Sequence, residues 1–164
     1  FLTGGKMKMK GYKFAKRGCV VAVAILIIFG FLSEVKGADW VYYGDDSDGN
    51  KYFYDRSSIR NVSEGIVEVW DKKVFTKKGR LEEIKIRQKR NLPTEGFDSW
   101  REERLLQVIN CVHKKVSIAQ YIDYAIDGRI LKSGSNKDIT IWGNIAPGSV
   151  NEALMEEVCK KAKK

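Results

Sequence analysis

An aspartate-rich stretch, GDDSDGNKYFYD from Gly44 onward, is the part of the sequence that comes closest to a metal-binding loop. Calcium loops of the EF-hand type carry acidic or amide side chains at positions one, three and five, glycine at six and a bidentate acid at twelve. If Gly49 takes position six, Asp46 and Asp48 take positions three and five, and Asp55 takes position twelve. Position one is then a glycine, and position twelve is shorter than the usual glutamate.

The segments on either side of this loop have the composition of strands. DWVYYG and NKYFYD are aromatic and β-branched, whereas an EF-hand needs a helix on each side of its loop. An Asp-Gly pair between two such runs is a strong signal for a tight hairpin. We therefore expect Asp48 and Gly49 to turn the chain between two strands, and we expect neither a metal site nor a cofactor.

Few other residues have the types and spacing that catalysis requires. His113 is the only histidine, and it precedes two lysines that disfavour its charged form. Adjacent acids occur at residues 82–83, 102–103 and 156–157. Neighbours on a strand point to opposite faces, and neighbours on a helix diverge by about 100°, so we expect these acids to be solvated. With no nucleophile elbow or phosphate-binding loop in the sequence, we expect a protein that is not an enzyme.

Residues 1–37 have the three-part layout of an export signal. Basic residues precede an apolar run at 19–32, and small residues follow at Val35 and Gly37. The run has 14 residues, fewer than the roughly 20 that span a bilayer as a helix. We expect cleavage between Gly37 and Ala38, with membrane contact only during export.

This leader predicts an extracytoplasmic protein, in the periplasm, in the outer envelope or secreted. Cys19 begins the apolar run, whereas a lipidated cysteine follows one, so we expect it to be removed with the leader. Residues 1–6 precede the first methionine and are expected to be an upstream extension. The remaining residues, 38–164, have the length of a single domain.

Two cysteines, Cys111 and Cys159, remain after the leader. An even number of cysteines in an exported chain favours a disulfide. The alternative is a metal site with His113, but the third ligand lies far down the sequence and an oxidising compartment disfavours free thiols. We therefore predict a bridge between Cys111 and Cys159.

The net charge of +9 is carried mostly by the leader. Seven of the 30 basic residues and one of the 21 acidic residues lie in residues 1–37, which leaves 23 basic and 20 acidic residues. This near balance gives no support to nucleic-acid binding.

One segment, residues 72–90, is nevertheless strongly basic, with nine basic and two acidic residues. The rest of the chain after residue 37 has 14 basic and 18 acidic residues. We expect this segment to dock an anionic protein or glycan. The alternative is that its lysines protect an exposed sheet edge. The basic residues are Lys72, Lys73, Lys77, Lys78, Arg80, Lys85, Arg87, Lys89 and Arg90.

The apolar pattern predicts strands through most of the chain and one helix at its end. Residues 65–78 suggest a long strand, and the alternation of Ile84 and Ile86 with basic residues predicts another at 82–90. Strands at 105–113 and 115–125 precede an Asp-Gly turn and a further short strand.

The terminal helix begins at Ser149, which forms a capping box with Glu152. The predicted fold is therefore α+β: an antiparallel sheet of about six strands built from hairpins, with one C-terminal helix packed on it and linked to it by the disulfide.

Several spaced segments together resemble the surface-adhesin protein E family. They are DWVYYGDDSDGNKYFYDRSSI, VEVWDKK, LLQVINC, YIDYAIDG and WGNIAPGSVNEALMEEVC, in this order over residues 39–159. The resemblance implies a Gram-negative envelope protein with an antiparallel sheet, a C-terminal helix and a cysteine bridge. Its best-known member is an adhesin that binds host matrix proteins such as vitronectin and laminin.

Two functions follow as expectations. The first is an exported, non-enzymatic binding or adhesion module that uses the basic segment. The second is a structural or assembly factor of the envelope that acts through its sheet edge, for example as a homodimer.

Overall fold

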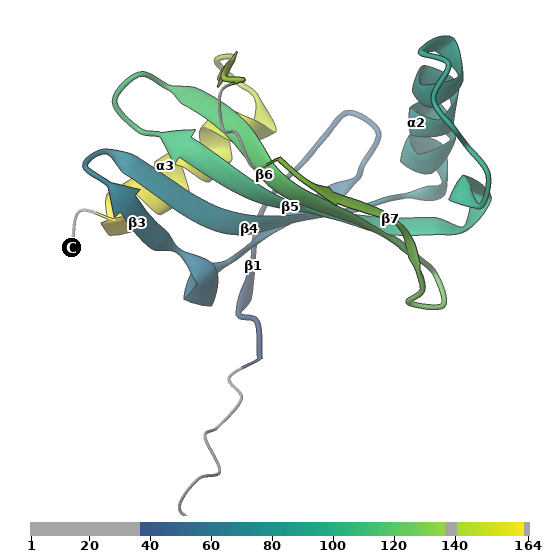
Figure 1. The fold of residues 1–164 in the computed structure, drawn as a ribbon, viewed down its shortest axis with the longest axis horizontal. Helices are drawn as coiled ribbons and strands as arrows, with labels where there is room; N and C mark the ends of the chain where they lie inside the picture. The colour runs from purple at the N-terminus through teal and green to yellow at the C-terminus, as the bar shows by residue number, and fades with distance from the viewer. Residues whose placement is uncertain (1–36, 137–140, 163–164) are drawn as a thin grey trace, which may run out of the picture. The chain divides into compact units, whose positions relative to one another are not determined.

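Eight strands pair antiparallel in one sheet (Figure 1). The structure is a computed structural model that describes residues 37–136 and 141–162; almost all of the predicted leader, including Cys19, lies outside these residues. Six strands follow the order β1-β2-β4-β5-β6-β7, while β3 pairs with β4 and β8 pairs with β6. The strands are β1 (Trp40–Asp45), β2 (Lys51–Asp55), β3 (Arg60–Ser63), β4 (Ile66–Val74), β5 (Trp100–Asn110), β6 (Lys115–Ala125), β7 (Ile130–Ser135) and β8 (Gly143–Asn144).

Tight turns join neighbouring strands into hairpins, which confirms the predicted antiparallel sheet. Gly49 has a φ of 75° in the turn between β1 and β2, and Gly128 has a φ of 83° between β6 and β7. These left-handed conformations favour glycine, which has no Cβ to clash. The long strands β5 and β6 pair from Trp100 opposite Ala125 to Asn110 opposite Lys115.

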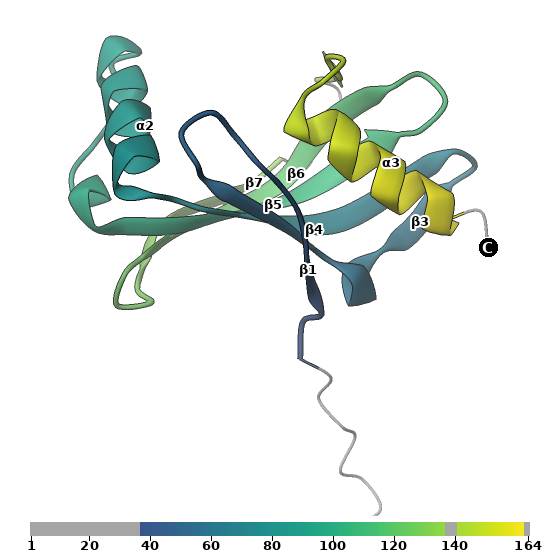
Figure 2. The same cartoon turned by 180° about the vertical axis from the view of Figure 1, so that it is seen from behind.

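The helix α3 (Val150–Ala162) covers one face of the sheet (Figure 2). Ser149 Oγ accepts a hydrogen bond from Glu152 N at 3.2 Å, and the Glu152 carboxylate accepts one from Gly148 N at 2.7 Å. The predicted helix start is thus confirmed. Full burial of one leucine or valine contributes about 1.5–3 kcal/mol. The buried core consists of Tyr54, Val67, Val69, Ile109, Ile145, Leu154, Met155 and Val158.

The predicted disulfide links this helix to the sheet. Cys111 directly follows β5 and Cys159 lies in the last turns of α3, with their Cα atoms 5.9 Å apart. The two cysteines are 48 positions apart in the sequence, and the bond closes the loop between them. The cysteine pairing and the packing of α3 on the strands therefore support each other.

The prediction of a strand at residues 82–90 is wrong. This segment belongs to the helix α2 (Lys77–Lys89), which projects from the end of the sheet opposite α3 (Figures 1 and 2). The alternation of Ile84 and Ile86 covers only a few positions, and leucine, glutamate, lysine, arginine and glutamine all favour helices. Ile84 packs on a small core, whereas Ile86 is 41% exposed.

That small core anchors α2 to the sheet. It consists of Phe75 at the end of β4, Phe97 in the short 3-10 helix η2 (Phe97–Ser99) and Trp100 at the start of β5. The Phe75 and Trp100 ring centroids lie 4.2 Å apart, and those of Phe97 and Trp100 lie 4.9 Å apart. A second 3-10 helix, η1 (Arg56–Ser58), follows β2.

Candidate functional site

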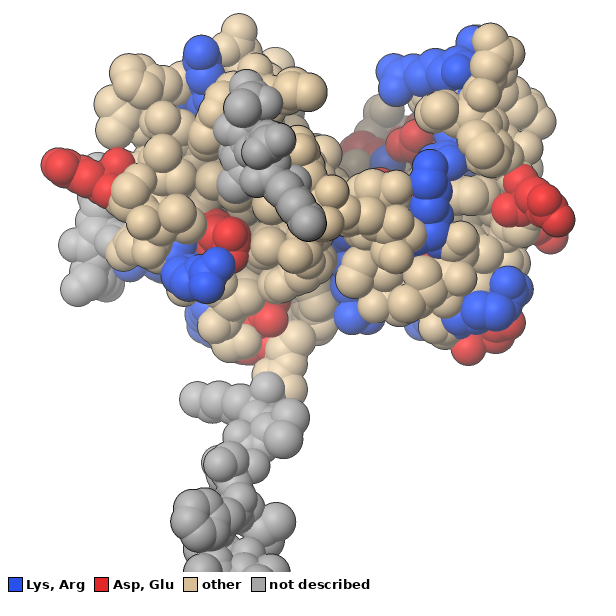
Figure 3. Space-filling model, in the orientation of Figure 1, with Lys and Arg blue, Asp and Glu red and all other residues tan. Residues whose placement is uncertain are grey.

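Five of the nine predicted contact residues are exposed together on α2 and its end. This set, called the α2 basic face below, consists of Lys77, Lys78, Lys85, Lys89 and Arg90. Figure 3 shows blue side chains at the tip of the projecting helix. Because α2 stands away from the bulk of the sheet, these charges are open to a large partner.

The turn between β1 and β2 holds the start of α2 in place. Thr76 is the N-cap, and its Oγ1 accepts a hydrogen bond from Gly79 N at 3.0 Å. Thr76 Oγ1 also donates to the Asp48 carbonyl oxygen at 2.9 Å. Asn50 Oδ1 accepts from Thr76 N at 2.9 Å. The loop that resembles a calcium site is thus a turn that docks on a helix.

Asp46 stabilises this turn from within. Its carboxylate accepts hydrogen bonds from the backbone N of Asp48 and of Asn50 at 3.0 Å each, from Asn50 Nδ2 at 2.9 Å, and from the Tyr52 hydroxyl at 3.0 Å. Burial opposes these hydrogen bonds, which together lower the pKa of Asp46. Burial, and then the hydrogen bond to Asp46, raises the pKa of Tyr52. The carboxylate therefore organises the turn through donors of the protein itself.

Asp55, which takes the twelfth position in the calcium alignment, has a different partner set. Its side chain accepts hydrogen bonds from Asp39 N and Ser57 N, each at 2.9 Å, and from Ser57 Oγ at 2.6 Å. It is the N-cap of η1 and is buried. In the described part of the chain, no group of three or more His, Cys, Asp or Glu side chains is arranged to hold a metal ion.

The cations of the α2 basic face differ in their pairing. Lys78 Nζ lies 2.9 Å from Asp48 Oδ1, and this hydrogen bond raises the pKa of Lys78. Lys85 pairs with Glu82 at 2.8 Å. Lys89 and Arg90 lie at the carboxyl end of α2, where the helix dipole favours positive charge. Exposed pairs such as these contribute little to stability, so the face can exchange its partners for an external anion.

Three other predicted contact residues hold α2 to the sheet. Lys73 Nζ lies 2.7 Å from Glu83 on α2 and 3.7 Å from Asp46. The Arg80 guanidinium donates to the Trp100 carbonyl oxygen at 3.1 Å. Arg87 completes the set.

Arg87 stacks on the small core beneath α2. Its Cζ lies 4.0 Å from the Phe97 ring centroid, and its Nε donates to the Pro93 carbonyl oxygen at 3.1 Å. These contacts leave Lys73, Arg80 and Arg87 as structural cations whose replacement would loosen α2.

Lys72, the ninth predicted residue, lies on the opposite face of β4 from Lys73. Its Nζ lies 4.1 Å from the Trp40 ring centroid and 5.0 Å from that of Phe53. Burial lowers its pKa. Within the described residues it makes no ion pair. Lys72 thus belongs to a surface separate from the α2 basic face.

That surface is the face of the sheet opposite α3, and the sequence analysis did not single it out. Alternate positions of β1, β4 and β6 place large side chains on it, which is a period-two signal that the sequence carries. Arg104 Cζ lies 4.6 Å from the Tyr124 ring centroid and 5.6 Å from that of Trp40. We call this set the open aromatic face; it consists of Trp40, Phe53, Trp70, Lys72, Arg101, Arg104 and Tyr124.

Three acids line the α3 side of the sheet. Burial raises the pKa of Asp71 to about 6, although hydrogen bonds from Tyr43 at 2.8 Å and Gln107 at 2.9 Å oppose the shift. Burial and the charge of Asp123 raise the pKa of Glu103 to about 7, and burial raises that of Asp123 to about 6.

The environment of Glu102 and Glu103 differs from the expectation that adjacent acids are solvated. They point to opposite faces as predicted, with Glu102 paired to Arg104 and Glu103 opposite Asp123. They are not solvated, however: the Glu102 side chain is only 14% exposed, and burial is the main cause of the Glu103 shift.

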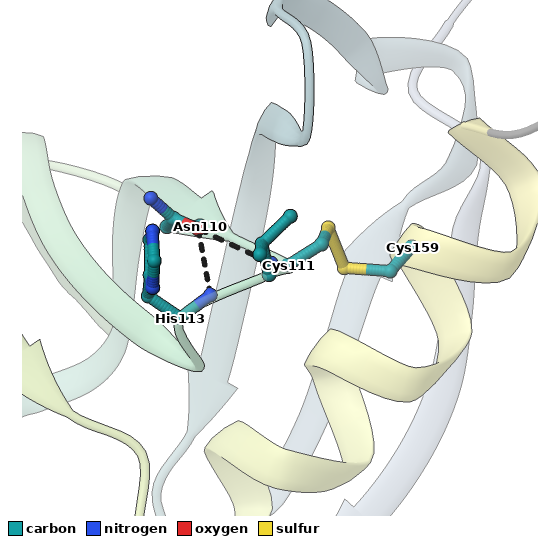
Figure 4. The surroundings of a disulfide bond; sticks show 5 residues. Asn110, Cys111, His113 and Cys159 are labelled. Atoms are coloured by element: carbon teal, nitrogen blue, oxygen red, sulfur yellow. Dashed lines mark hydrogen bonds between the residues drawn. A yellow bond between two sulfur atoms is a disulfide. The ribbon is translucent and has the colours of Figure 1, made fainter.

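His113 lies in the turn between β5 and β6, close to the disulfide (Figure 4). Its backbone N donates to Asn110 Oδ1 at 2.9 Å, and the backbone N of Val112 donates to the same oxygen at 3.1 Å. The side chain of His113 is exposed, and Cys111, two residues earlier in the chain, is in the disulfide.

In residues 37–136 and 141–162, no helix is long and apolar enough to cross a membrane.

These features define a small α+β domain with an antiparallel sheet, a disulfide-linked terminal helix and a projecting basic helix. The family model of surface-adhesin protein E matches residues 40–160, and the chain belongs to this family.

Solved structures of protein E match this chain at low sequence identity. Crystal form II of Haemophilus influenzae protein E is 15% identical, with 80% of this chain and 94% of that chain covered and a TM-score of 0.46. Protein E from non-typeable Haemophilus influenzae is 12% identical, with 80% and 81% covered and a TM-score of 0.44. A search of curated proteins gave no match.

Proposed function

We propose that this protein is an extracytoplasmic, non-enzymatic binding module whose α2 basic face contacts an anionic protein or glycan. The observation that carries the proposal is the projection of five exposed cations on α2, away from the sheet. Membership of the surface-adhesin protein E family supports an adhesive role outside the cytoplasm.

The α2 basic face suits a partner recognised by charge. Its lysines are exposed and carry flexible, strongly hydrated ammonium groups, which bind anions as point charges. Clustered charge of one sign raises the rate of encounter with an anionic partner and makes binding sensitive to salt. This charge-based mode of binding therefore fits an extended polyanion or an acidic protein surface.

The test is retention of the purified protein on immobilised heparin and on immobilised polyglutamate, with dextran as an uncharged control. The proposal predicts retention on at least one polyanion, elution at raised salt and no retention on dextran. Retention on dextran, or passage through both polyanion columns at low salt, would contradict it.

A second candidate function is envelope assembly through a sheet edge. In the described sheet β7 is an outer strand, and its sequence ILKSGS contains a single charged residue, Lys132. Ile130 is 53% exposed. An edge with so little charge can pair with another chain. Light scattering separates the two functions, because pairing through β7 predicts a dimer and a strict monomer contradicts it.

A further inference from the structure

The open aromatic face has the chemistry of a ligand site and is not covered by either described helix. The core residues of α3 pack against Val67 and Val69 of β4, whereas Trp70 and Lys72 of the same strand point the other way. The outer strand β1, separated from β4 by β2, carries Trp40. The result is a platform of aromatic rings with cations among them.

Two adjoining hollows mark the face. One has a volume of about 160 Å³ and is lined by Trp40, Trp70, Ile122, Tyr124 and Arg104, among others. The other has a volume of about 310 Å³ and is more polar. Both include Arg104 and Tyr124 in their walls. An aromatic hollow therefore continues into a polar one.

Positive charges outnumber negative charges on the open aromatic face. Lys72 Nζ and Arg104 Cζ lie 4.1 and 5.6 Å from the same Trp40 ring centroid, and Arg101 and Arg104 together line the polar hollow. The acid among them is Glu102, which pairs with Arg104. The other acid at the aromatic hollow, Asp55, is buried and holds the start of η1. An approaching anion meets a surplus of positive charge.

We infer that the open aromatic face binds a short acidic oligosaccharide, with a sugar ring stacked in the aromatic hollow and a carboxylate held by Lys72 and Arg101. The C–H face of a pyranose is apolar and flat, and it packs on indole and phenol rings. Arginine and lysine favour carboxylates through charge-assisted hydrogen bonds. A site with aromatic walls and a few placed polar groups is typical of small-ligand binding.

Single-stranded nucleic acid is the competing ligand, since bases also stack on sheet aromatics. Such binding needs cations that follow a phosphate chain over several nucleotides. Here the face offers only three cations, Lys72, Arg101 and Arg104, which suits one or two carboxylates on a short chain. The open aromatic face and the α2 basic face share no residue, so this inference goes beyond the proposed function.

The experiment is titration of the purified protein with trigalacturonate, followed by calorimetry and tryptophan fluorescence, because Trp40 and Trp70 line the hollow. Maltotriose serves as the neutral sugar and oligothymidylate as the nucleic acid. We expect trigalacturonate to bind, with a shift in tryptophan emission, at least about tenfold more tightly than maltotriose.

Variants test which residues bind trigalacturonate. Lys72→Gln with Arg101→Gln removes two charges at partly or fully exposed positions, and we expect it to weaken trigalacturonate binding about tenfold with an unchanged melting temperature. Trp40→Ala should abolish the emission shift. The control, Lys85→Glu with Lys89→Glu on α2, should bind trigalacturonate as the parent does.

Three results overturn the inference: no binding of trigalacturonate, unchanged affinity in the folded Lys72→Gln and Arg101→Gln variant, or tighter binding of oligothymidylate than of trigalacturonate. Loss of heparin retention in the α2 variant with normal trigalacturonate binding would leave this site intact, so failure of one surface is distinguishable from failure of the other.

Discussion

The Asn50 side chain lies against Gly79, in the space that a Cβ at position 79 would occupy. Gly79 is buried in the first turn of α2, and Asn50 is 1% exposed at the end of the β1–β2 turn. Since Asn50 also accepts from Thr76 N, one amide fixes both the turn and the helix start. Glycine at position 79 is thus required by packing.

Gly79→Ala should lower the free energy of unfolding, although the same change in an exposed helix stabilises by about 1 kcal/mol. The added methyl displaces Asn50, and overpacking of this kind costs about 1–3 kcal/mol. Urea denaturation measures the change. The control Gln88→Ala, at an exposed position of the same helix, should stay within about 0.5 kcal/mol of the parent. A Gly79→Ala protein more stable than the parent would refute the contact.

The disulfide gives a second prediction. Replacing Cys111 and Cys159 together by serine should lower the free energy of unfolding by about 4 kcal/mol, because the bond closes a long loop in the unfolded chain. Denaturation of the oxidised, reduced and double-serine proteins checks this. Reduced and double-serine proteins should agree with each other. Equal stability of all three would show that α3 packs without help from the bond.

The acids on the α3 side predict how stability changes with pH. The pKa of Glu103 is raised from an ordinary 4.5 to about 7, and those of Asp71 and Asp123 from 3.8 to about 6. Between about pH 4 and 7 the folded state therefore binds more protons than the unfolded state, so these acids make the protein less stable as pH rises. Below about pH 4 these acids no longer lower the stability of the protein.

Glu103→Gln tests this directly. The amide cannot ionise, so we expect the variant to exceed the parent by about 1–3 kcal/mol in free energy of unfolding at pH 8, and to match it near pH 4. Thermal unfolding at both pH values measures the difference, and the exposed pair member Glu82→Gln is the control. A variant less stable than the parent at pH 8 would mean that charged Glu103 stabilises the fold, for example through Lys73.

Much of the fold could be predicted from local signals. The Asp48-Gly49 turn, the hairpins, the capped helix at Ser149 and the Cys111–Cys159 pair each rest on residues close in sequence or on cysteine parity. The helix α2 could not be predicted in the same way, because the period-two pattern of Ile84 and Ile86 is too short to exclude a helix. Its anchor, Trp100, comes from a later strand.

The site was predictable only in part. The charge of residues 72–90 identifies the basic segment, but charge alone does not distinguish the exposed Lys85 from Arg87, which stacks on Phe97. That difference depends on which side of a helix faces the sheet. The open aromatic face depends in turn on the pairing of strands distant in sequence, which brings Trp40 to Lys72 and Arg104.

Charge reversal on α2 tests whether the α2 basic face contacts an anionic partner. Lys77→Glu, Lys85→Glu and Lys89→Glu change three exposed residues and spare the structural cation Arg87. The matched control reverses three exposed lysines elsewhere, namely Lys114, Lys115 and Lys160.

The measurement is the salt concentration that elutes each folded variant from immobilised heparin, or from polyglutamate if heparin does not retain the parent. The α2 variant should elute at distinctly lower salt than the parent, and the control variant close to the parent, because α2 presents its charges as one projecting cluster. Equal elution of the two variants would contradict the account.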